Sequence, residues 1–233
     1  MNGATAVHSR FEGFPRQAFE LLRQLAEHNN RAWFAANRAA LEAALVRPAL
    51  ALVTELGPML RHRVSPGLRA EPRVGGSILR LQHDARFVRA GPFRTHLELW
   101  FWEGRGASRD HPGYFLRLTP DRLVVGAGIT LLPADRLLRY RAAVDQPGSG
   151  RELAAIVHRL ERAGWSLEGG RIGRVPKPCS ADHERGGLLR LVGLRMERAE
   201  PLPETVFGPG LPQLLVTEFV RLRPLHRWLM KLE

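Results

Sequence analysis

The chain has 233 residues, of which 44% are hydrophobic, and this is enough apolar material for an ordinary globular core. This composition excludes a disordered chain and a coiled coil. Thirty-five basic residues against 23 acidic residues leave a net charge of +12, so anionic partners are favoured over cationic ones.

The chain carries no signal for an oxidising compartment or a membrane. Cys179 is the single cysteine and cannot form an intramolecular disulfide. The first ten residues lack the apolar core of a signal peptide, and no stretch approaches the roughly 18 apolar residues of a membrane helix. We therefore expect a cytoplasmic protein without a membrane partner.

The first sixty residues are predicted to be helical. Residues 15–29 have an amphipathic helical pattern, and Pro15 suits a first turn. Asn30 is expected to cap a second helix, and Pro48 is expected to kink it or start a third. The core-facing stripe of this second helix is Trp33, Phe34, Leu41 and Leu45. Residues 64–76 contain prolines and glycines and are expected to form a loop.

Short strands are predicted next, at residues 97–102, 114–119 and 122–130. Pro133 is expected to begin a helix that ends near residue 144. Residues 146–150 are predicted to be a linker, and a further amphipathic helix is predicted around residues 153–160. Residues 165–198 are expected to contain both helix and strand, and residues 200–212 to form an irregular connection. A closing helix follows, which is expected to break near Pro224.

These elements predict an α+β fold, with a central, mostly antiparallel sheet flanked by N-terminal and C-terminal helices. We expect a single domain over residues 11–231. It would comprise a helical part at 14–60, a sheet-containing core at 73–130 and a mixed helix and strand part at 133–231. The pair Gly126 and Gly128 within the third strand favours close backbone packing over a phosphate loop, because the remaining glycine positions of such loops are missing.

The most informative segment is residues 78–87. Read as a strand, it places Arg80, Asp84 and Arg86 on one face, with same-face neighbours roughly 7 Å apart. One carboxylate does not neutralise two guanidinium groups, and the planar forks of arginine suit phosphate or carboxylate oxygens. Arg94 and His96 follow a glycine–proline turn and could converge on the same anion. The alternative is a surface salt-bridge ladder that binds nothing.

This segment resembles a known family. Arg80, His83, Asp84, Arg86 and Phe87, followed by Pro92, Phe93, Arg94, Thr95 and His96, resemble the RxxRDxRF and KxPYKTH-type segments of the mostly bacterial Domain of Unknown Function 2461. Landmarks in the expected order extend the resemblance over residues 11–231. His83 replaces the second arginine of the motif, Phe93 replaces its tyrosine, and the lysine is missing. The resemblance implies a shared fold and leaves the activity open.

Several residues are candidates for function. The anion-binding candidates are Arg80, Arg86, Arg94 and Lys177, the last because it lies in a Pro-Lys-Pro turn that resembles a family landmark. Asp84 and His96 are weaker candidates for an acid–base role. We predict no cofactor, and no metal, because the acidic and histidine residues lack standard ligand spacing.

Three function classes remain. The sequence favours a pocket that binds an anionic small molecule, such as a phosphate-containing ligand, and that belongs to an enzyme or to a binding protein. The first alternative is a nucleic-acid-binding protein that uses a basic surface, for which aromatic residues such as Trp100 and Trp102 would be stacking groups. The second is a non-catalytic interaction module. The sequence leaves the oligomeric state open.

Overall fold

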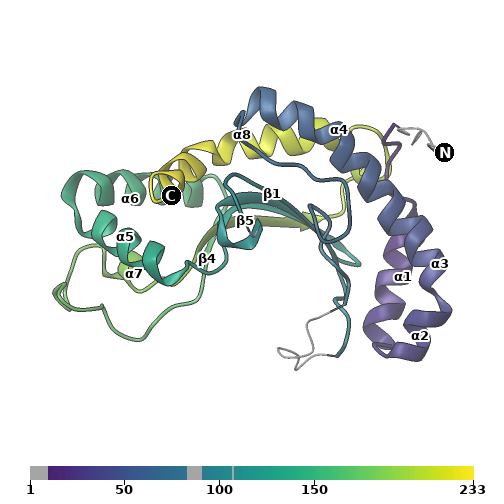
Figure 1. Cartoon of the computed structure of the whole chain (residues 1–233), viewed down its shortest axis with the longest axis horizontal. Helices are drawn as coiled ribbons and strands as arrows, with labels where there is room; N and C mark the ends of the chain where they lie inside the picture. The colour runs from purple at the N-terminus through teal and green to yellow at the C-terminus, as the bar shows by residue number, and fades with distance from the viewer. Residues whose placement is uncertain (1–9, 83–90, 107) are drawn as a thin grey trace. The chain divides into compact units, whose positions relative to one another are not determined.

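A computed structural model describes residues 10–82, 91–106 and 108–233 of the chain (Figure 1). It confirms the α+β prediction, because helices accompany a five-stranded antiparallel sheet with strand order β1-β2-β3-β5-β4. The chain divides into two compact units. The first comprises residues up to Trp100 together with Leu116–Leu123 and Glu200–Thr217, and the second comprises Phe101–Phe115, Val124–Ala199 and Glu218–Glu233.

The helices of the first unit follow the sequence pattern. They are α1 (Arg16–Glu27), α2 (Arg31–Ala36), α3 (Arg38–Leu41) and α4 (Arg47–Arg63). The predicted cap is confirmed, because the Asn30 side chain accepts a hydrogen bond from the backbone N–H of Trp33. The expected second helix is divided, because Asn37 ends α2 and a π-helical turn, η1 (Glu42–Val46), precedes α4.

Proline explains the π-helical turn. Pro48 lies in the first turn of α4 and has no backbone N–H to donate. Just before it, the N–H of Arg47 bonds to the carbonyl of Glu42, five residues back, so the hydrogen bonding is rerouted and the chain stays helical. The sequence predicted a kink or a new helix at this proline, and the structure resolves it as a π turn followed by α4.

The core of the first unit lies under the apolar stripes of these helices. Leu22, Leu25 and Leu45 are fully buried. The rings of Phe19 and Phe207 pack edge to face, with centroids 5.3 Å apart. The second helix buries less than its stripe predicted, since Leu41 and Leu45 are buried but Trp33 and Phe34 are half-buried.

The sheet contains the predicted strands almost residue for residue. They are β1 (Leu97–Trp102), β2 (Gly113–Leu118) and β3 (Arg122–Ile129), followed by β4 (Ser166–Glu168) and β5 (Leu194–Pro201). Strands β4 and β5 pair antiparallel, with Leu167 opposite Met196. Trp100 and Trp102 are buried, which argues against their use as base-stacking groups.

The second unit holds α5 (Ala134–Asp145), α6 (Pro147–Arg162) and α7 (Gly186–Leu189). Its core contains Tyr140 and Trp228, whose rings meet edge to face. The Tyr140 hydroxyl donates a 3.0 Å hydrogen bond to the carbonyl of Leu188, so this buried polar group is satisfied. Two short 3₁₀ turns are η3 (Ser108–Asp110) in this unit and η4 (Glu204–Phe207) in the first unit.

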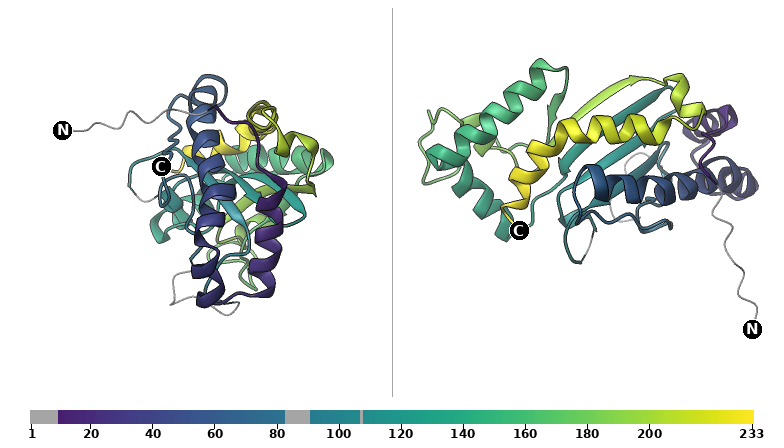
Figure 2. Two further views of the ribbon diagram at one scale, coloured as in Figure 1. Left: turned by 90° about the vertical axis from the view of Figure 1, so that its right-hand side faces the viewer. Right: turned by 90° about the horizontal axis from the view of Figure 1, so that it is seen from above.

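Two expectations about chain breaks were wrong. The predicted linker at residues 146–150 is the first turn of α6, because Pro147 occupies the first helical position, where proline is preorganised. The closing helix is not broken at Pro224. Helix α8 (Leu211–Met230) contains this proline and stays helical through it, although Figure 2 shows the helix bending toward its C-terminal end. In addition, β5 and η4 occupy much of the connection expected at residues 200–212.

Candidate functional site

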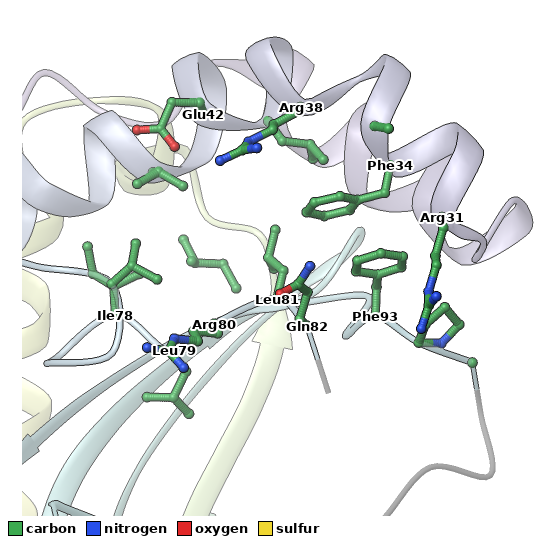
Figure 3. A pocket seen from close by; sticks show the side chains of 17 residues that line it. Arg31, Phe34, Arg38, Glu42, Ile78, Leu79, Arg80, Leu81, Gln82 and Phe93 are labelled. Atoms are coloured by element: carbon green, nitrogen blue, oxygen red, sulfur yellow. The ribbon is translucent and has the colours of Figure 1, made fainter. Parts of the chain in front are cut away.

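A cavity of about 1150 Å³ lies within the first unit (Figure 3). One wall comes from α2, α3 and η1, and the opposite wall comes from the segments 74–82 and 91–97. Its volume exceeds the roughly 300–1,000 Å³ of ordinary small-molecule sites. The lining residues are Arg31, Phe34, Ala35, Arg38, Leu41, Glu42, Val46, Val74, Ile78, Leu79, Arg80, Leu81, Gln82, Gly91, Pro92, Phe93 and Leu97.

Helical periodicity builds the first wall. Arg31, Phe34 and Arg38 are separated by three and four residues, and this spacing turns side chains toward the same side of a helical segment. Glu42 follows four residues after Arg38, on the π turn. In Figure 3 these side chains extend from the helices along the cavity, with Arg38 above it and Arg31 beside Phe93.

The second wall is an extended segment held beside β1. The N–H of Leu79 donates to the carbonyl of Glu98, and the N–H of Trp100 donates to the carbonyl of Ser77. Isolated antiparallel bridges join Ile78 to Leu99 and Gln82 to Phe93. The alternation of a strand puts Ile78 and Gln82 on the same face as Arg80. Arg80 and Gln82 are exposed as this pattern predicts, whereas Ile78 is buried.

Asn29 and the two phenylalanines tie the walls together. The Asn29 side chain accepts from the backbone N–H of Phe93 at 3.0 Å and donates to the carbonyl of the same residue at 2.8 Å. The rings of Phe34 and Phe93 stack with centroids 4.0 Å apart and planes 4° apart. Gly91 adopts a φ of +100°, and a Cβ there would lie 2.8 Å from the Asn29 side chain. The two walls are therefore fixed to each other at this end of the cavity.

Arg94 braces the second wall. Its Nη1 donates to the carbonyl of Arg80 at 2.6 Å and to the carbonyl of Gln82 at 3.3 Å. The backbone N–H of Arg94 also donates to the carbonyl of Leu81. In the described structure this guanidinium holds the extended segment by its backbone, and Arg94 does not line the cavity.

His96 belongs to a compact ion-pair cluster with Glu98 and Arg117. The Glu98 carboxylate lies 3.0 Å from Arg117 Nε and 3.5 Å from His96 Nε2. Burial by itself raises the pKa of Glu98, but hydrogen bonds from His96 and Arg117, together with the charge of Arg117, lower it to about 2. The carboxylate is thus ionised at neutral pH, and it orients the imidazole of His96.

The charge around the cavity is unbalanced. Arg31, Arg38 and Arg80 are exposed at its edge, and Glu42 is the acidic residue among the described residues that line it. Within the described part of the chain, no ion pair or side-chain hydrogen bond involves any of these four charged groups. Among the described residues that line this mostly apolar cavity, three guanidinium groups and one carboxylate leave a local excess of positive charge.

The structure places the predicted site residues in different environments. Arg80 lines the cavity, whereas Arg94 and His96 lie on adjoining backbone and are engaged as described above. Asp84 and Arg86, together with His83, lie outside the described residues. Lys177 is exposed in the second unit and is not among the residues that line this cavity.

The sequence-based reasoning missed Arg31, Arg38 and Glu42. The signal was present, because arginines seven residues apart with Phe34 between them indicate one helical face. The core-facing stripe predicted for this helix, Trp33, Phe34, Leu41 and Leu45, left the two arginines out. Pairing it with a segment some forty residues later requires the tertiary fold.

Two histidines of the second unit have acidic partners. In the second unit, His111 Nδ1 lies 3.0 Å from the Glu233 carboxylate, and His183 Nε2 lies 3.2 Å from that of Asp145. Over residues 10–82, 91–106 and 108–233, no group of three histidine, cysteine or acidic residues is arranged to hold a metal ion. None of the helices described combines the length and apolar character that a membrane crossing requires.

Comparison with known proteins tests the resemblance. No curated protein matches the chain. The model of one family, described as "Conserved hypothetical protein (DUF2461)", matches residues 17–228, which is most of the sequence. This match confirms the family that the resemblance indicated, and the chain therefore belongs to this family.

Proposed function

We propose that the protein binds a small anionic ligand, carrying a phosphate or carboxylate group, in the cavity of the first unit. The observation that carries the proposal is the excess of arginine there. Of the described residues that line this cavity, Arg31, Arg38 and Arg80 are basic and Glu42 is acidic, and none of these four has a described ionic partner. Guanidinium groups held around a concave site are suited to bind phosphate and carboxylate oxygens.

The other predicted residues take different parts in this proposal. Arg94 keeps the Arg80 segment in place through backbone carbonyls, so it acts as a positioning residue. Arg86 remains a proposed contributor from the sequence, and Lys177 remains a proposed distal one. For Asp84 and His96 an acid–base role remains a proposal. Glu98, which the sequence argument did not single out, is the group that would orient His96.

A ligand panel tests the proposal against a basic surface that binds nucleic acid. The purified chain is mixed with inorganic phosphate, butyl phosphate, butyrate, a mononucleotide or a short single-stranded oligonucleotide, each at two salt concentrations. Thermal unfolding is then recorded. A ligand present at about 100 times its Kd stabilises by roughly 2.7 kcal/mol, which raises Tm by about 5 °C or more.

The expected result is that at least one small phosphate or carboxylate raises Tm, with a modest salt dependence because about three arginines take part. Stabilisation by the oligonucleotide alone, lost steeply as salt increases, would instead indicate a spread basic surface. If none of the five compounds shifts Tm or gives a measurable binding isotherm, the proposal fails.

A further inference from the structure

The interior of the cavity is mostly aliphatic, although its edge is basic. Phe34, Leu79 and Leu81 are half-buried, and Val74 is 43% exposed, so apolar side chains of this wall remain accessible in the folded chain. The aliphatic lining residues are Ala35, Leu41, Val46, Val74, Ile78, Leu79, Leu81 and Leu97. Water against such a surface is unfavourable, and an apolar part of a ligand would displace it.

Because the three arginines lie at the edge of the cavity, the charged part of a ligand would bind at this edge. Arg31 and Arg38 come from the helical wall and Arg80 from the opposite wall, and Figure 3 shows aliphatic side chains between them. A polyanion would leave this aliphatic surface unused. A small hydrophilic anion would bind a guanidinium group, but it would leave most of the cavity of about 1150 Å³ unfilled.

The aromatic residues argue for an alkyl body rather than a flat one. Phe34 and Phe93 stack on each other at 4.0 Å, so each ring already has one face covered, and Phe93 is buried. The remaining apolar side chains of the wall are aliphatic, and a flexible alkyl chain can pack against them.

We propose that the ligand of this cavity is an amphipathic anion, in which a phosphate or carboxylate headgroup binds the arginines and an alkyl chain packs against the wall formed by Val74, Leu79 and Leu81. This inference rests on the proposed function and specifies the class of its ligand. Fully burying one methylene group is worth about 0.8 kcal/mol, which corresponds to about a fourfold gain in affinity. Affinity should therefore rise with chain length.

The test is a calorimetric titration of the full chain with ethyl, butyl, hexyl and octyl phosphate, each below the concentration at which it forms micelles. Octanol and vesicles of phosphatidylcholine with phosphatidic acid are the comparison arms. The expected result is a Kd that falls by about twofold to fourfold per added methylene, with much weaker binding of octanol.

Each of the other outcomes would refute a specific part of the proposal. Equal affinities for ethyl and octyl phosphate would refute the alkyl chain and leave the anion site standing. Octanol binding as tightly as octyl phosphate would refute the anion site. Binding to the vesicles without binding to any free alkyl phosphate would indicate a membrane-surface contact and refute the cavity ligand.

Variants test whether the dependence of affinity on alkyl chain length arises from the wall formed by Val74, Leu79 and Leu81. Val74→Ser and Leu81→Ser are expected to weaken octyl phosphate binding severalfold and ethyl phosphate binding much less, because each removes apolar contact that a longer chain uses more. Leu138→Ser is the matched control, since Leu138 is 68% exposed on α5 and does not line the cavity. An equal loss in Leu138→Ser, or no loss in either cavity variant, would refute the assignment.

Discussion

Replacing Glu98 with glutamine is expected to lower the free energy of unfolding by about 3 kcal/mol at pH 7. The pKa of this carboxyl falls from an ordinary 4.5 to about 2 in the folded chain, and each pKa unit corresponds to about 1.4 kcal/mol. The amide keeps the shape of the side chain but removes the charge that Arg117 and His96 face, so the mostly buried Arg117 loses its ionic partner.

The same substitution has a defined pH dependence. Because the folded pKa lies below the unfolded one, the stabilisation by Glu98 is complete above pH 4.5 and is lost as the pH falls from 4.5 toward 2. Urea unfolding of the natural chain and Glu98→Gln should therefore differ most at pH 7 and converge in acid. The control is Glu161→Gln, an exposed carboxylate on α6, for which a change within about 0.5 kcal/mol is expected. A difference between the two proteins that stays constant from pH 7 to pH 3 would contradict this account.

The substitution Gly128→Ala is expected to destabilise the chain by about 3 kcal/mol or more. Gly128 lies in β3 with a φ of +145°, which side chains rarely adopt. A Cβ there would lie 2.0 Å from the carbonyl oxygen of Leu194 and 2.7 Å from Cα of Arg195. Both are backbone atoms of the neighbouring strand β5, so relief would require the strands to separate.

Gly148 provides the matched control. It lies in the first turn of α6, and a Cβ there meets no atom within 4 Å, so Gly148→Ala should leave stability unchanged or raise it by up to about 1 kcal/mol. Chemical denaturation of both variants measures the contrast. Equal stability of Gly128→Ala and Gly148→Ala would show that β3 and β5 are not paired as described.

Local signals predicted most of the fold. Asn30 caps α2 as its residue type suggested, and β1 spans the six residues whose aromatic and aliphatic character indicated a strand. Gly126 and Gly128 were assigned to close packing, and a Cβ at Gly126 would indeed lie 2.5 Å from the ring of Phe115. These features depend on neighbours in sequence or on a single steric requirement.

The errors arose where composition and tertiary packing disagree. The Pro-Gly-Ser-Gly run before Arg151 has the composition of a linker, yet it begins α6. Gly150 is required there because a Cβ would lie 2.0 Å from the carbonyl of Val144, and Arg185 donates to that same carbonyl from far along the chain. No local pattern contains that contact.

The sequence predicted only part of the candidate site, because the rest depends on contacts between segments far apart in the chain. Arg80 was identified from its strand position, and it lines the cavity. Arg94 stays a predicted anion-binding residue, and its guanidinium also bonds to the backbone carbonyls of Arg80 and Gln82, contacts that residue type alone does not reveal. Arg31 and Arg38 share a helical face, and only the fold brings that face opposite Arg80.

The most direct measurement compares two triple variants of equal charge. In the first, Arg31, Arg38 and Arg80 become glutamine, and in the second the exposed α6 residues Arg151, Arg159 and Arg162 become glutamine. Each is titrated with whichever small anion binds the natural chain best, at fixed salt. The cavity variant is expected to bind this anion at least about tenfold more weakly than the natural chain, and the α6 variant is expected to bind it within about twofold of the natural chain. Equal losses in both variants, or full binding by the cavity variant, would contradict the existence of an arginine-lined anion site in this cavity.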